Sequence, residues 1–172
     1  MLVGNGKGTF TRQLTDGSSV VFAPLVITAG DFNNNGQSEI IVAYGNTDNI
    51  DIFVAFDTGA FTNQITYSTG SAPRSVAVGD FNNDTRLDIV VVNYGDNTVS
   101  VLLGYSNGSF ANQTTYSTGP FPSSVAVGDF NNDTQLDIVV VNWDDNTVSV
   151  LLGYGNGSFA NQTTYSTATE YG

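Results

Sequence analysis

Apolar and polar positions fall in short blocks along the chain, and no block has the 3.6-residue spacing of a helix. Residues 75–81 (SVAVGDF) lead into an acidic loop, and residues 87–93 (LDIVVVN) form a continuous apolar run that predicts a strand buried on both faces. Residues 98–105 (TVSVLLGY) mix β-branched and apolar side chains, whereas residues 109–118 (SFANQTTYST) are polar and suit a solvated outer strand. Because Gly-Asp-Asn and Ser-Asn-Gly turns separate these blocks, the pattern predicts four antiparallel strands.

This four-strand pattern is one unit of an internal repeat. Asp31, Asp80 and Asp129 begin the segments DFNNNGQSE, DFNNDTRLD and DFNNDTQLD, and each start lies 49 residues after the previous one. Residues 76–118 and 125–167 differ at only four positions, whereas the first copy aligns with them but has diverged. A period of this size indicates a propeller, a solenoid or an array, and four strands graded from apolar to polar make one propeller blade.

The chain begins in the middle of a unit. Residues 2–13 (LVGNGKGTFTRQ) match the second half of a blade, as in residues 102–113 (LLGYSNGSFANQ). We therefore expect an all-β fold of about three and a half blades, as an open arc or as a ring completed by self-association. The predicted boundaries are a partial blade at 1–23 and blade repeats at 24–72, 73–121 and 122–172.

The stretch VAVGDFNNDTRLDIVVVNYGDNTVSVLLGYSNGSF resembles the FG-GAP/VCBS repeat, the blade of integrin-α-type propellers and of many secreted adhesion and lectin-like proteins. The resemblance covers nearly the whole chain and implies that calcium binds in the loop between the first two strands of a blade. The family loop usually has Gly at its sixth position; Gly36 keeps this residue, but Thr85 and Thr134 replace it. Family propellers also commonly have seven blades, about twice the number here.

The acidic loops have the residue spacing of a site for a hard cation. Side-chain oxygens stand at loop positions 1, 3, 5 and 9, and the carbonyl of position 7 adds a fifth ligand, which suits Ca²⁺ better than Mg²⁺. The predicted ligands, with one ion for each loop, are Asp31, Asn33, Asn35, Gln37 and Glu39; Asp80, Asn82, Asp84, Arg86 and Asp88; and Asp129, Asn131, Asp133, Gln135 and Asp137. The first loop has two carboxylates rather than three and should bind most weakly. The alternative is a polar turn rich in Asn and Asp without an ion.

Composition restricts the function further. The formal charge of -12 argues against nucleic acid and anionic membranes as partners, since both require a basic patch. The chain has no His and no Cys, which removes most transition-metal and thiol chemistry, and no apolar run long enough to cross a membrane. Residues 1–4 do not resemble a signal peptide, and residues 4–8 (GNGKG) align with a hairpin turn rather than a phosphate-binding loop. We expect a non-enzymatic protein.

Six Asn-x-Ser/Thr triplets predict N-linked glycans, all of them in the second and third copies: Asn83, Asn107, Asn112, Asn132, Asn156 and Asn161. Each lies on a predicted turn, loop or outer strand, although a chain this rich in Asn, Ser and Thr also produces such triplets by chance. Asn83 occupies loop position 4, so its side chain should point away from an ion held by Asp84.

These features together predict an extracellular, calcium-binding, N-glycosylated repeat protein for adhesion or structure. An open arc exposes apolar blade faces and strand edges, which favours self-association into a fibre or ring, or contact with further repeats of the same chain. Glycans and cell-surface proteins are the other candidate partners. The alternative function is a carbohydrate-binding lectin. It is based on aromatic residues beside acidic ones: Tyr94, Trp143, Tyr105 and Tyr154 beside Asp96, Asp144 and Asp145.

Overall fold

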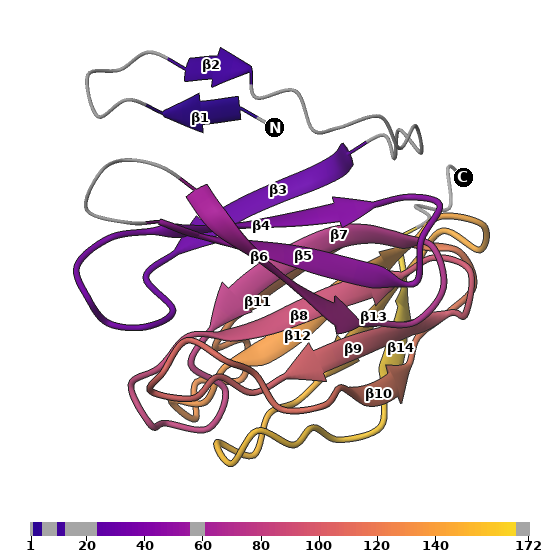
Figure 1. The fold of residues 1–172 in the computed structure, drawn as a ribbon. Helices are drawn as coiled ribbons and strands as arrows, with labels where there is room; N and C mark the ends of the chain where they lie inside the picture. The colour runs from indigo at the N-terminus through magenta and orange to yellow at the C-terminus, as the bar shows by residue number, and fades with distance from the viewer. Residues whose placement is uncertain (1, 5–9, 13–23, 56–60, 168–172) are drawn as a thin grey trace.

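The computed structural model describes residues 2–4, 10–12, 24–55 and 61–167, and none of these residues is helical. Three four-stranded antiparallel sheets follow one another along the chain, and a separate two-stranded sheet stands at the N-terminus (Figure 1). Strands that are consecutive in the sequence are hydrogen-bonded neighbours in each sheet. The sheets stack without closing into a ring, which confirms the predicted all-β arc of propeller-type blades.

Blade 1 consists of β3 (Pro24–Gly30), β4 (Glu39–Tyr44), β5 (Asn49–Ala55) and β6 (Phe61–Ser68). Blade 2 consists of β7 (Pro73–Gly79), β8 (Asp88–Asn93), β9 (Thr98–Leu102) and β10 (Thr114–Ser117). Blade 3 consists of β11 (Pro122–Gly128), β12 (Asp137–Asn142), β13 (Thr147–Leu151) and β14 (Thr163–Ser166). The N-terminal hairpin consists of β1 (Leu2–Gly4) and β2 (Phe10–Arg12). The first strands of the blades, β3, β7 and β11, lie next to one another where the blades meet.

The hydrophobic core lies between the blades. We call the side of a blade that faces the next blade in the sequence its forward face, and the opposite side its backward face. The forward face of blade 3 is the side that corresponds to the forward faces of blades 1 and 2. In β8, Ile89 and Val91 pack backward into the core shared with blade 1, whereas Val90 and Val92 pack forward into the core shared with blade 3. Every residue of β8 is buried, so the strand predicted to be buried on both faces is confirmed.

The outer strand differs from the prediction. The sequence predicts one solvated strand over residues 109–118, but β10 begins only at Thr114. Before it, Phe110 forms an isolated bridge with Gly104 and turns its ring into the core between blades 1 and 2. Burial of this large apolar side chain stabilises the fold more than continued pairing of the polar strand would, because removing an aromatic ring from water contributes more free energy than one further hydrogen bond at the sheet edge.

Gly104 is required where the third strand of blade 2 ends. A Cβ atom at this position would lie 2.4 Å from the carbonyl oxygen of Leu87, and a Cβ atom on Gly153 in blade 3 would lie 2.2 Å from that of Leu136. Only glycine therefore lets the chain approach the preceding strand so closely. This approach places the backbone N–H of Gly104 within reach of the acidic loop.

Alanine substitutions at Phe81 and Phe130 compare a buried phenylalanine with an exposed one in the same local sequence, since both residues occupy loop position 2. Phe81 is 2% exposed between blades 2 and 3, whereas Phe130 is 54% exposed on the forward face of blade 3. We expect Phe81→Ala to reduce the free energy of unfolding by about 3–5 kcal/mol, and Phe130→Ala by less than about 1 kcal/mol. Urea denaturation at low protein concentration measures both values, and equal losses would contradict the assignment of the core.

Candidate metal centre

The three acidic loops share one network of hydrogen bonds, which begins at the aspartate in position 1. In the second loop, Oδ1 of Asp80 accepts the N–H of Asp84 at 3.0 Å, and Oδ2 accepts the N–H of Thr85 at 2.7 Å. Asp31 and Asp129 accept the corresponding pairs of N–H groups in the first and third loops. Each loop is therefore wound around the carboxylate of its first residue.

The side chains at positions 3 and 5 continue this network. Oδ1 of Asn82 accepts the N–H of Asp84 at 3.1 Å, and Oδ1 of Asp84 accepts the N–H of Arg86 at 2.9 Å. The first and third loops repeat both bonds through Asn33 and Asn35 and through Asn131 and Asp133. The oxygens at positions 1, 3 and 5 thus fold back over the same turn, and each still has a lone pair available to a ligand.

Two positions in each loop have positive φ, which places them in the left-handed region. At position 6 the φ values are 84° for Gly36, 68° for Thr85 and 71° for Thr134. The backbone is thus the same whether or not the residue is glycine, although a β-branched residue in this region costs about 1–2 kcal/mol. At position 4, Asn34, Asn83 and Asn132 are also left-handed, a conformation that Asn tolerates better.

The carboxylate at position 9 lies beneath the loop rather than within it. Oδ2 of Asp88 accepts the N–H of Phe81 at 2.8 Å, and Oδ1 accepts the N–H of Gly104 at 2.7 Å. Asp137 makes the same two bonds, to Phe130 and Gly153, and Glu39 accepts the N–H of Phe32. Burial raises the pKa of Asp88 to about 6, and these N–H groups only partly offset the effect.

The second and third loops differ in charge at position 7. The guanidinium of Arg86 lies 2.9 Å from Oδ2 of Asp84, whereas Gln135 stands at the corresponding place beside Asp133. Burial raises the pKa of Asp84, but the N–H of Arg86, the amide of Asn82 and the guanidinium outweigh it and leave the pKa below its usual value. A cation thus already stabilises this carboxylate in the second loop.

The donor set fits a hard divalent cation. Within the described residues, no group of three or more acidic side chains is arranged to hold a metal by itself, so a site must also use the Asn side chains and the carbonyl at position 7. Mixed carboxylate, amide and carbonyl oxygens are the ligands that calcium takes. Burial and, to a smaller extent, the charges of Asp84 and Asp80 raise the pKa of Asp88, so a cation among these carboxylates would relieve their mutual repulsion.

The six predicted glycan acceptors have different surroundings. Nδ2 of Asn83 donates to Oε1 of Gln135 at 2.6 Å and to the carbonyl of Gly155 at 3.3 Å, so this amide joins blade 2 to blade 3. A glycan on Asn83 would compete with that contact, which local sequence does not predict because both partners are in the next blade. Asn132, the equivalent residue of blade 3, is exposed, as are Asn107, Asn156 and Asn161.

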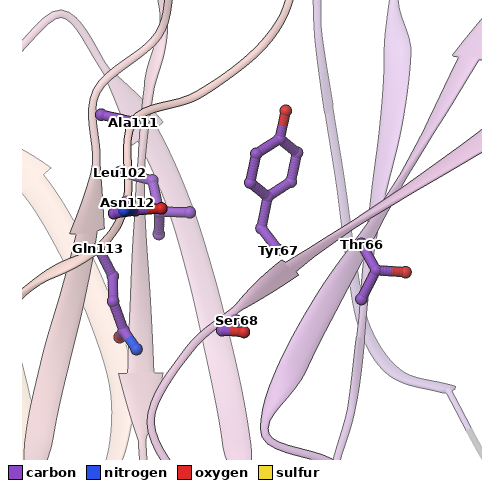
Figure 2. Close-up of a pocket in the computed structure, with 7 residues that line it drawn as sticks. All are labelled: Thr66, Tyr67, Ser68, Leu102, Ala111, Asn112 and Gln113. Atoms are coloured by element: carbon purple, nitrogen blue, oxygen red, sulfur yellow. The ribbon is translucent and has the colours of Figure 1, made fainter.

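Asn112, the remaining acceptor, lines a groove of about 500 Å³ between blades 1 and 2 (Figure 2). The groove runs between Thr66, Tyr67 and Ser68 of β6 and residues 111–113, with Leu102 at its side. The hydroxyl of Tyr67 accepts the backbone N–H of Phe110 at 3.1 Å, so the two blades are joined beside this acceptor.

The model of the FG-GAP-like repeat matches residues 31–91 and 80–140, which include all three acidic loops. The chain belongs to the FG-GAP-like repeat family. The family is one of repeat modules, in agreement with the resemblance inferred from the loops and strands. Among curated protein sequences, none matches this chain.

Two solved structures are similar to this FG-GAP-like chain in fold. A functionally unknown protein from Desulfotomaculum acetoxidans aligns with a TM-score of 0.60 and 14% identity, covering 92% of this chain and 46% of that one. The BBS1N chain from its complex with ARL6DN aligns with a TM-score of 0.57 and 14% identity, covering 92% of this chain and 48% of that one. This chain therefore spans just under half the length of either structure. In the described part of the chain, there is no helix of sufficient length and hydrophobicity to cross a membrane.

The buried carboxylate of Asp88 should make stability depend on pH when calcium is absent. Its folded pKa of about 6 is higher than the value of about 4 in an unfolded chain, so the folded state binds this proton more tightly. The stabilising contribution is complete below pH 4 and is lost as the pH rises through 6. Lowering the pH from 7 to 5 in EDTA should therefore raise the free energy of unfolding by about 1 kcal/mol through this group.

Asp88→Asn is the control for this measurement, because the amide cannot take up a proton while every other titratable group of the chain is unchanged. Urea denaturation of both proteins at pH 5 and pH 7 isolates the contribution of Asp88. The same pH dependence in the two proteins would contradict the assigned role.

Proposed function

We propose that the protein is an extracellular repeat module whose acidic loops bind calcium, and that it serves adhesion or structure rather than catalysis. The observation that carries the proposal is the identical loop backbone in all three copies, with Thr85 and Thr134 in left-handed conformations that Thr adopts only at a cost. A loop that keeps this left-handed turn in all three copies, at a conformational cost in two of them, is suited to arranging its oxygens around an ion.

In the second loop, the calcium ligands would be the side chains of Asp80, Asn82, Asp84 and Asp88 and the carbonyl of Arg86. The first and third loops would use the equivalent residues. A bound ion would supply positive charge that neutralises the crowded carboxylates and would join the loop to Asp88 beneath it. Since Asp88 also accepts the N–H of Gly104, calcium binding would stabilise the first three strands of the blade together.

An extracellular location is supported by the family, whose repeats are typical of extracellular proteins, and by the exposed Asn-x-Ser/Thr acceptors. Extracellular calcium at millimolar concentration suits sites of modest affinity. The acidic surface, with a net charge of -12, also suits a protein that works in a medium rich in divalent cations.

The lectin alternative has one observation in its favour. Trp143 is 69% exposed, and its backbone N–H donates to the carbonyl of Phe121, so two aromatic residues lie close together at one end of blade 3. Tyr94, the equivalent of Trp143, is less accessible, because Arg74 lies 4.3 Å above its ring and Phe121 packs beside it. A glycan array on the wild type and on Trp143→Ala distinguishes carbohydrate binding from a purely structural role.

Calcium should raise the thermal stability of the chain. A ligand at 100 times its dissociation constant adds about 2.7 kcal/mol, which corresponds to a rise in Tm of about 5–10 °C in a domain of this size. Differential scanning calorimetry in EDTA, in 5–10 mM CaCl₂ and in equal MgCl₂, about the range such sites need, should show the largest rise with calcium. Asp84→Asn together with Asp133→Asn should remove most of the rise, and an unchanged Tm in the wild type would contradict the proposal.

Exchange of the position-7 residues should change the calcium affinity of the second and third loops in opposite directions. Arg86→Gln removes a cation that competes for Asp84, and should strengthen binding at the second loop about fivefold. Gln135→Arg introduces the same cation beside Asp133 and should weaken binding at the third loop by a similar factor. Isothermal titration calorimetry measures both affinities, and shifts in the same direction would exclude this role for Arg86.

A further inference from the structure

Each contact between blades is centred on one phenylalanine held by two aromatic side chains of the preceding blade. Phe110 of blade 2 packs edge-on against Phe32 and Tyr67 of blade 1, with ring centroids 5.6 Å and 5.5 Å apart. Phe159 of blade 3 packs in the same way against Phe81 and Tyr116 of blade 2, at 5.5 Å in both cases. We call the pair formed by the loop phenylalanine and the outer-strand tyrosine the aromatic socket of a blade.

Blade 3 has an aromatic socket that nothing in the described structure fills. Its members are Phe130 and Tyr165, which are 54% and 56% exposed. Val141 lies on the same forward face and is 43% exposed, whereas its equivalent in blade 2, Val92, is fully buried. The sequences of blades 2 and 3 are identical at these three positions, so the exposure arises because no following blade covers this face in the described part of the chain, and not from a change of residue.

The N-terminal hairpin carries the segment that fits such a socket. The inserted phenylalanine follows a Gly-Ser pair in both filled interfaces, as Gly108-Ser109-Phe110 and Gly157-Ser158-Phe159. The hairpin has the same pattern, Gly8-Thr9-Phe10, and pairs Gly4 with Phe10, as Gly104 pairs with Phe110 and Gly153 with Phe159. Its backbone register is therefore that of the two segments that fill the internal sockets.

We propose that the socket of blade 3 receives Phe10 from the N-terminal hairpin of a second copy of this chain. The contact continues the stacking already present between blades 1 and 2 and between blades 2 and 3, with the same aromatic triad. Because the hairpin and the socket are different surfaces, the contact is heterologous and leaves a free hairpin and a free socket at the two ends of every assembly. The chain then associates head to tail, which goes beyond the calcium-binding role and does not depend on it.

Sedimentation velocity and light scattering across a range of concentrations test this proposal. The wild type should increase in mass with concentration beyond that of a dimer, both in EDTA and in calcium. Phe130→Ala and Phe10→Ala should each associate at least about tenfold more weakly, because one aromatic anchor is lost, and should be monomeric at concentrations where the wild type begins to assemble. Because association is also measured in EDTA, it is tested independently of calcium. If the loops bind no calcium, the association in EDTA should still be observed.

Mixing the two variants gives the most specific result. Phe130→Ala retains an intact hairpin and Phe10→Ala an intact socket, so an equimolar mixture should form a 1:1 heterodimer and nothing larger. Tyr165→Ala is a second socket variant, whose association should also be lost. Tyr154→Ala is the matched control, because its equivalent Tyr105 stays exposed even though blade 2 lies between two blades, and this variant should associate like the wild type.

Several results would overturn the proposal. A wild-type chain that is monomeric at every concentration excludes the contact. A Phe10→Ala variant that associates normally while Phe130→Ala does not would assign the socket to a different segment. A Phe10→Ala variant that forms dimers alone would show that two sockets meet each other. Circular dichroism of each variant confirms that it remains folded, which is expected because Phe130 and Tyr165 are exposed.

Discussion

The structure of a blade depends on one buried carboxylate at the ninth position of its acidic loop. Asp88 accepts the N–H of Phe81 from the loop and the N–H of Gly104 from the end of β9, and Asp137 repeats both bonds in blade 3. A single side chain thus connects the loop after the first strand, the start of the second strand and the end of the third. Removing either N–H from water without this acceptor would cost about 1–3 kcal/mol.

This connection makes the proposed ion site and the contact between blades parts of one unit. Phe81, whose N–H is bonded to Asp88, is the residue whose ring packs against Phe159 of the next blade. The third loop contributes too, since its eighth residue, Leu136, packs into that core. Phe81 is therefore the residue shared by the hydrogen-bond network of the loop and the aromatic contact between blades.

The sequence was sufficient to predict the repeat, the four strands of each blade and the position of the acidic loops, because all three depend on local periodicity. Burial of Phe110 was not predictable, since one aromatic residue in a polar stretch has no periodic signal and its partners are in the preceding blade. The inter-blade bond from Asn83 to Gln135 was missed for the same reason. The ion pair of Arg86 with Asp84 was also missed, because the turn that brings residues two positions apart together is a three-dimensional feature.

The near-identity of blades 2 and 3 makes the chain its own control for the effect of context. Phe81 and Phe130 are the same residue in the same local sequence, hydrogen-bonded to the same kind of carboxylate, yet one is buried and the other is mostly exposed. Local sequence therefore sets the conformation of the loop, and the neighbouring blade sets the burial of the ring. A surface adapted only to water would not need to keep phenylalanine, valine and tyrosine together on one face. The forward face of blade 3 thus has the composition of a protein core, because its residues are the same as those that form the core between blades 2 and 3.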